Sequence, residues 1–121
     1  MYNSLVLAYI GDSVYEVYIR QFLIERGLVK VNDLQKEAIK YVSAKGQANI
    51  LKQLLDNGYL AEEEIDIIKK ARNHKSHGSK TTDILTYKHA TALEALIGHL
   101  YLFKKYDRLN DIMKYITEEL C

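Results

Sequence analysis

Two acidic side chains stand alone in apolar stretches of the sequence, which makes them candidates for chemistry. Asp12 is the only formally charged residue between positions 1 and 15, and Glu94 is the only acid between positions 84 and 106. Burying a carboxylate is costly unless a positive group meets it. Each acid therefore needs a partner, and a metal ion is one candidate.

A glycine lies near each of these acids, Gly11 beside Asp12 and Gly98 one turn after Glu94. Glycine inside a helix costs roughly 1 kcal/mol relative to alanine, so close helix packing is its expected use. Two helices that cross at these glycines would bring both carboxylates to one cation. Hard oxygen ligands select Mg²⁺ or Mn²⁺ rather than zinc. In the alternative interpretation each acid faces solvent or pairs with a Lys or Arg, and the pattern alone leaves both open.

A third acid, Glu16, lies one turn after Asp12 and one turn before Arg20. A helical Glu and Arg at that spacing commonly form a surface ion pair. We therefore interpret Glu16 as structural, with a supporting role behind the metal ligands as the alternative.

A basic cluster that contains no acid runs from Lys69 to Lys80. Lys and Arg side chains interspersed with small polar donors suit a phosphate backbone. The candidate binding residues are Arg72, Asn73, Lys75, Ser76 and Lys80. The alternative is a solvated loop whose charges bind nothing. His74 and His77 do not indicate zinc, because no cysteine or third ligand lies at a plausible spacing.

The composition is that of an ordinary globular domain, with 48% hydrophobic and 27% charged residues in a chain of 121. This length predicts one domain over residues 1–121. The net charge of +1 says nothing about partners by itself. Cys121 is the single cysteine, which excludes an intrachain disulfide and favours the reducing cytoplasm. The sequence shows no signal peptide and no apolar run long enough to span a membrane.

Hydrophobic periodicity, the absence of proline and the scarcity of glycine predict an all-α, compact helical domain. Six helices are expected: Asn3 or Ser4 to about Arg26, Asn32 to about Tyr41, Ala44 to Asn57, Ala61 to Arg72, Thr86 to Lys105, and Asp107 almost to Cys121. The expected N-caps include Asn3 or Ser4, Asn32 in a capping box with Gln35, Ser43 and Thr86. Positions 73–86 are expected to form a loop.

Two segments of the sequence resemble the motifs of a known nuclease family. Residues 7–15, Leu-Ala-Tyr-Ile-Gly-Asp-Ser-Val-Tyr, resemble the catalytic signature of ribonuclease III, Glu-x-x-Glu-Phe-Leu-Gly-Asp-Ala-Val. Residues 94–98, Glu-Ala-Leu-Ile-Gly, resemble its second motif, Asp-x-x-Glu-Ala-x-x-Gly, and Arg-Asn-His-Lys-Ser lies between the two. The resemblance covers essentially the whole chain. It is closest to Mini-III ribonucleases, which keep the helical ribonuclease III domain and lack a double-stranded RNA-binding domain.

The resemblance assigns roles to individual residues. Asp12 matches the signature aspartate and Glu94 the second-motif glutamate, which implies that both are catalytic metal ligands. The two signature glutamates of ribonuclease III fall on Leu5 and Ala8, and the second-motif aspartate falls on Thr91. Mini-III enzymes look similar in this respect. The departure implies a shell that phosphate oxygens and water complete.

The resemblance implies a homodimeric endonuclease that cuts double-stranded RNA with Mg²⁺, for which Mn²⁺ can substitute. The implied substrate is the precursor of 23S ribosomal RNA, presented by a ribosomal protein or an assembly intermediate. The first helix, apolar on many faces, independently predicts a dimer. The rival interpretation is a non-catalytic RNA-binding protein on the same fold. The presence of both Asp12 and Glu94 argues against that rival.

Overall fold

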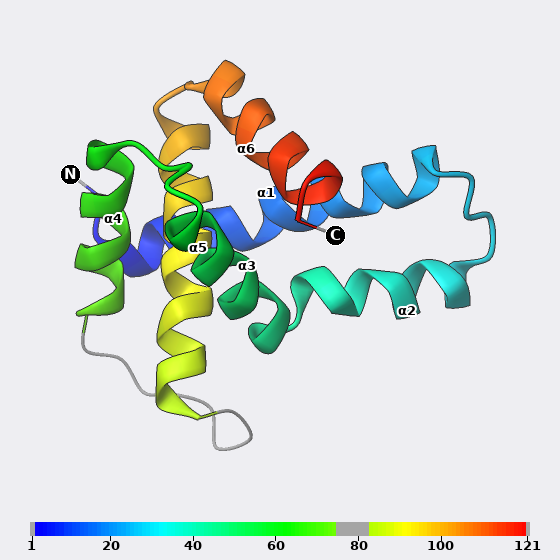
Figure 1. The fold of residues 1–121 in the computed structure, drawn as a ribbon, viewed down its shortest axis with the longest axis horizontal. Helices are drawn as coiled ribbons and strands as arrows, with labels where there is room; N and C mark the ends of the chain where they lie inside the picture. The colour runs from blue at the N-terminus through cyan, green and yellow to red at the C-terminus, as the bar shows by residue number, and fades with distance from the viewer. Residues whose placement is uncertain (1, 75–82, 121) are drawn as a thin grey trace.

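Helix α5 occupies the middle of the fold, with the other helices arranged around it (Figure 1). The computed structural model describes residues 2–74 and 83–120. These residues form six helices and no strand: α1 (Ser4–Glu25), α2 (Val31–Val42), α3 (Ala44–Asp56), α4 (Glu62–Arg72), α5 (Ile84–Leu102) and α6 (Tyr106–Glu118). The predicted all-α class is therefore confirmed.

The position of α5 explains why its sequence is apolar on every side. It contacts α1, α3, α4 and α6, which together cover the middle of the helix. Its buried residues are Ala90, Thr91, Ala92, Leu93, Ala95, Leu96, Ile97, Gly98 and Leu100. The second half of α1 and the antiparallel α2 extend away from this core (Figure 1). The buried hydroxyl of Tyr15 joins them by donating to the carbonyl of Tyr41 at 2.8 Å.

Helices α1 and α5 cross with their backbones in contact. A Cβ atom added at Gly11 would lie 1.8 Å from the carbonyl oxygen of Glu94. A Cβ atom added at Gly98 would lie 1.9 Å from the carbonyl oxygen of Leu7. Both distances are far inside van der Waals contact, so only glycine fits at either position. The predicted close crossing at these two glycines is confirmed.

One face of α1 remains exposed in the single chain. The large apolar residues on this exposed face of α1 are Tyr2, just before the helix, and Leu5, Val6, Tyr9, Val17 and Ile24. The rest of α1 packs against α2, α4, α5 and α6, and the dimer predicted from its apolar faces stays a prediction. Asp12 is likewise exposed, so its carboxylate is not desolvated as the sequence pattern suggested. Glu94, by contrast, is only partly accessible.

Two of the predicted helix caps are confirmed. The side chain of Asn3 accepts a hydrogen bond from the backbone N–H of Val6 at 2.9 Å and starts α1. The hydroxyl of Ser43 accepts one from the N–H of Gly46 at 3.0 Å and starts α3. Both satisfy backbone donors that the first turn of a helix leaves free.

Two other predicted caps are wrong. Helix α2 begins at Val31, and its first backbone bond, from the N–H of Leu34 to the carbonyl of Lys30, leaves Asn32 inside the helix. Helix α5 begins at Ile84 because Asp83 caps it, accepting from both the N–H and the hydroxyl of Thr86. The negative charge of a carboxylate at the N-cap also interacts favourably with the helix dipole. The neutral hydroxyl of Thr86 would lack this interaction.

A buried ion pair fixes α4 against α6. Glu64 is 7% exposed, and Arg108 donates to its two carboxylate oxygens from Nε and Nη2, at 2.8 Å each. The same Nη2 reaches the carbonyl of Tyr59 at 3.0 Å, and the N–H of Ala61 donates to Glu64 at 2.9 Å. These charge-assisted bonds hold the pKa of Glu64 below its usual value against the opposing effect of burial.

We predict that Gly11→Ala and Gly98→Ala each destabilise the domain by more than about 3 kcal/mol, because the added methyl group meets backbone rather than a side chain that can move. Gly27→Ala is the matched control. Gly27 has a φ of +98° and nothing within 4 Å of an added Cβ. Its substitution should cost only about 1 kcal/mol through backbone strain. Urea unfolding of the three variants measures the difference, and equal losses would contradict the close crossing.

Candidate active site

The two isolated acids meet in one pocket where α1 crosses α5. The pocket has a volume of about 510 Å³ and is lined by Leu5, Ala8, Tyr9, Ile10, Asp12, Ser13, Tyr87, Thr91 and Glu94. Asp12 comes from α1 and Glu94 from α5. Because Gly11 rests against the backbone of Glu94, the residue after this glycine is placed beside the Glu94 side chain. The helix crossing therefore brings the two carboxylates together.

The surroundings of Glu94 in the pocket disfavour its ionised form. Burial, followed by the charge of Asp12 and a hydrogen bond with that residue, raises the pKa of Glu94 from 4.5 to about 8. The Gln47 amide opposes this shift by donating from Nε2 to a Glu94 oxygen at 3.4 Å. Without a cation, the pocket therefore favours the protonated form of Glu94 at neutral pH. A positive charge between the two carboxylates would relieve their repulsion.

The donor set fits a hard divalent cation with few protein ligands. Carboxylate oxygens suit Mg²⁺ and Mn²⁺, and Mg²⁺ sites commonly use one or two carboxylates together with water and substrate phosphate. Across residues 2–74 and 83–120, no cluster of three or more His, Cys, Asp or Glu side chains is present. Asp12 and Glu94 would therefore hold such an ion without a third protein carboxylate. This chemistry does not suit zinc, which prefers nitrogen and sulfur ligands.

All five positions matched to the ribonuclease III motifs line this pocket. They are Leu5, Ala8, Asp12, Thr91 and Glu94. Three of them carry side chains that do not ionise, and Thr91 is 7% exposed. The positions of a five-carboxylate site are thus all found around this pocket, but three of them carry side chains other than acids. The two that remain come one from each crossing helix.

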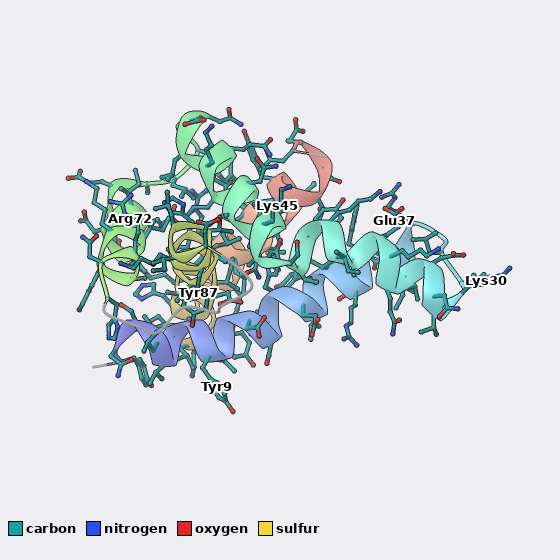
Figure 2. The ribbon with its side chains drawn as sticks, turned by 90° about the horizontal axis from the view of Figure 1, so that it is seen from below. Tyr9, Lys30, Glu37, Lys45, Arg72 and Tyr87 are labelled. Atoms are coloured by element: carbon teal, nitrogen blue, oxygen red, sulfur yellow. The ribbon has the colours of Figure 1, made fainter. Side chains whose placement is uncertain are left out.

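The described residues place two of the five candidate RNA-binding residues. Arg72 is the last residue of α4, and Asn73 is its exposed C-cap. Lys75, Ser76 and Lys80 lie outside the described residues. The basic cluster connects α4 to the start of α5, and Tyr87 in the first turns of α5 already lines the pocket. Figure 2 shows Arg72 and Tyr87 on these two elements, and Tyr9 projecting from α1 away from the body of the protein.

Glu16 forms the surface ion pair that its spacing predicts. Its carboxylate lies 3.4 Å from Nη2 of Arg20, one turn along α1. Both side chains are largely exposed, so the pair contributes little to stability. Glu16 does not line the pocket that holds Asp12. The predicted ion pair is therefore confirmed, and the structural role of Glu16 stays a prediction.

Two residues at the site, Gln47 and Tyr87, are not among those predicted from the sequence. Gln47 is a polar residue at an otherwise apolar position of α3, in line with Ile50, Leu51 and Leu54. That interruption of the apolar stripe is a signal that could have found it. Tyr87 gave no such signal, because residues 73–86 were expected to form a loop and the next turn of helix carried no charge pattern.

The fold and the pocket define a helical domain that carries a carboxylate pair suited to a divalent cation. Comparison with known protein families matches the Ribonuclease III domain over residues 5–105. The chain therefore belongs to the ribonuclease III family. Membership of this family makes it an endoribonuclease, a hydrolase of phosphodiester bonds.

Curated relatives place it more narrowly, among the Mini-ribonuclease 3 proteins. Mini-ribonuclease 3 of Brevibacillus brevis is 51% identical over 113 residues, covering 93% of this chain and 83% of the relative. Mini-ribonuclease 3 of Staphylococcus aureus is 44% identical over 115 residues, covering 94% of this chain and 86% of the relative. The resemblance found in the motifs is confirmed.

The fold is also similar to a solved structure. The crystal structure of a protein from Fusobacterium nucleatum superimposes with a TM-score of 0.84 at 34% identity, covering 97% of this chain and 93% of that one. None of the described helices is both long and apolar enough to cross a membrane.

We predict that Glu94 makes the metal-free protein less stable as the pH rises. Its folded pKa of about 8 lies above the value of 4.5 for a free side chain. Between these values the folded state binds more protons than the unfolded state, so its stability falls with increasing pH. Glu94→Gln should remove this part of the slope. In EDTA at pH 8.5 the variant should melt about 5 °C or more above the wild type, and at pH 4.5 the difference should vanish. A variant that melts below the wild type at both pH values would contradict the raised pKa.

Proposed function

We propose that this endoribonuclease cuts double-stranded RNA and requires Mg²⁺, for which Mn²⁺ can substitute. The observation that carries the proposal is the Asp12 and Glu94 pair, which lines one pocket on the positions of the family's catalytic acids. An RNA-binding protein without catalytic activity on the same fold is the alternative. It has no use for a carboxylate whose pKa is raised by burial and by the charge of a second carboxylate.

The chain's own residues give the site its chemistry. Asp12 of α1 and Glu94 of α5 would hold the cation in this pocket. When bound, Mg²⁺ supplies a lowered pKa for a coordinated water and stabilisation of the charge that develops during an in-line displacement. The side chains of Leu5, Ala8 and Thr91 leave room for water and substrate phosphate. Cleavage in this way yields 5′-phosphate and 3′-hydroxyl ends.

The basic cluster would hold the RNA backbone beside this pocket. Phosphate contacts from Lys and Arg position a nucleic acid without reading its sequence. The proposed contacts are Arg72, Asn73, Lys75, Ser76 and Lys80. In the sequence the cluster is followed by α5, whose Tyr87, Thr91 and Glu94 line the pocket. A duplex held there would present one of its phosphates to the carboxylate pair.

A homodimer would cover the exposed apolar face of α1. Val17 is 61% exposed, Val6 45% and Tyr9 82%, although all three are large apolar or aromatic side chains. Contiguous apolar surface of this kind marks an interaction site, and a twofold contact pairs the same surface of both copies. Because α1 also carries Asp12, such a contact would fix two active sites in one particle. Each site would then cut one strand of the duplex.

The proposed biological substrate is the precursor of 23S ribosomal RNA, which would place the enzyme in the cytoplasm. A ribosomal protein or a ribosome assembly intermediate would present the duplex. This proposal rests on the likeness to Mini-ribonuclease 3 proteins. Incubation of the protein with precursor RNA and with an unrelated duplex would show whether the sequence context matters.

We predict that Asp12→Asn and Glu94→Gln each lower the cleavage rate by at least about 100-fold while leaving the fold intact, because each nearly isosteric change removes a charge that the cation needs. Glu63→Gln is the matched control. Its carboxylate is exposed and pairs with Lys105 at 3.0 Å, away from the pocket. Cleavage of a labelled duplex RNA in Mg²⁺ measures all three. A near wild-type rate for either pocket variant would remove that residue from the site.

We predict that neutralising Arg72, Lys75 and Lys80 together weakens RNA binding without destabilising the domain. Fewer phosphate contacts release fewer counterions, so the slope of log affinity against log salt should fall by about 2 to 3. Binding of the inactive Glu94→Gln protein to duplex RNA at several salt concentrations provides the slope. A slope that does not change would mean that these side chains do not touch phosphate.

We predict a dimer at micromolar concentration and a monomer after Val17→Lys, because the new charge would be buried in the twofold contact. Val29→Lys is the matched control, since Val29 is 86% exposed in the turn between α1 and α2. It should remain a dimer. Light scattering coupled to gel filtration gives the masses, and a wild-type monomer would overturn the dimer proposal.

A further inference from the structure

A buried glutamine interrupts the apolar stripe of α3. Gln47 is 2% exposed, whereas its helical neighbours Ile50, Leu51 and Leu54 belong to the hydrophobic core. Burying a side-chain amide is costly unless its polar atoms find hydrogen-bond partners. A residue of this kind in a core position needs a use that an apolar residue of the same size cannot supply.

The partner of this amide is the Glu94 carboxylate. Nε2 of Gln47 donates to Oε2 of Glu94 at 3.4 Å, across the contact between α3 and α5. The bond is long for an N–H donor, as bonds at catalytic groups often are before substrate binds. An amide nitrogen donates a hydrogen bond and does not bind Mg²⁺. It therefore occupies one carboxylate oxygen without competing for the cation.

Contacts at the start of α3 fix the position from which the Gln47 side chain projects. A Cβ atom added at Gly46 would lie 2.3 Å from the carbonyl oxygen of Lys40, so α3 begins in backbone contact with the end of α2. The N–H of Gly46 donates to the Ser43 cap at 3.0 Å, and the N–H of Gln47 donates to the Ser43 carbonyl at 2.9 Å. These contacts fix the first turn of α3 and hence the direction in which Gln47 leaves it.

We propose that Gln47 is a positioning residue that holds the Glu94 carboxylate in the orientation in which it binds the cation. The inference rests on the proposed metal site formed by Asp12 and Glu94. A site with only two protein carboxylates gains more from a fixed orientation than one with four or five. Each freely rotating ligand must otherwise be ordered when the metal binds. Gln47 supplies that order from a third helix, which carries neither acid.

Gln47→Met tests the proposal, because methionine keeps the length of the side chain and removes the donor. The half-saturating Mg²⁺ concentration for cleavage should rise roughly tenfold or more, the size usual for partners that orient metal ligands. Mn²⁺ binding without RNA, followed by electron paramagnetic resonance, should weaken by a similar factor. The affinity for duplex RNA in Ca²⁺ should not change. Ile50→Val is the matched control, a neighbouring core position 3% exposed, and it should change stability alone.

The outcomes separate this inference from the proposed function. If the wild type neither cleaves duplex RNA nor binds Mn²⁺, the proposed function itself fails. If the wild type does both and Gln47→Met keeps the wild-type Mg²⁺ and Mn²⁺ midpoints, Gln47 is structural and the inference is overturned. Equal shifts in Gln47→Met and Ile50→Val would also overturn it, because loosening of the core would then explain the effect.

Discussion

The structure depends on one backbone contact, where α1 crosses α5 at Gly11 and Gly98. Each glycine faces a carbonyl of the opposite helix, and neither position has space for a methyl group. This contact places α5 in the middle of the fold, where its central residues from Ala90 to Leu100 are mostly buried. It also sets the distance between the side chains of Asp12, the residue after Gly11, and Glu94. Asp12 and Glu94 lie in one pocket because the two main chains touch.

The crossing creates an electrostatic conflict as well as a site. Burial and the nearby charge of Asp12 raise the pKa of Glu94, which is a cost to the folded state at high pH. A purely structural helix pair would avoid that cost with apolar side chains. The conflict is relieved in part by the Gln47 amide and would be relieved further by a divalent cation. A carboxylate with a strongly raised pKa beside an open pocket indicates a candidate functional site.

The sequence predicted the meeting of the two acids in one place better than it predicted the contacts around them. Asp12 and Glu94 were found because charge is rare in their apolar stretches, and the crossing was found because glycine is costly inside a helix. Gln47 and the buried pair of Glu64 and Arg108 were missed, since contacts between distant segments leave little trace in local spacing. Glu64 follows two other acids in the sequence, so its spacing does not distinguish it from an exposed residue of a first helical turn. The exposure of Asp12 was misjudged because an apolar face can await a partner instead of a core.

The most direct test of this account is to locate the cation. Crystals grown with Mn²⁺ at millimolar concentration and measured by anomalous diffraction would reveal the bound ion and its ligands. The account predicts a peak in the pocket at the crossing of α1 and α5, with carboxylate oxygens of Asp12 and Glu94 each about 2.1 Å away. The Gln47 amide should remain hydrogen-bonded to the second Glu94 oxygen. A peak elsewhere, or none in this pocket, would contradict the assignment of the active site.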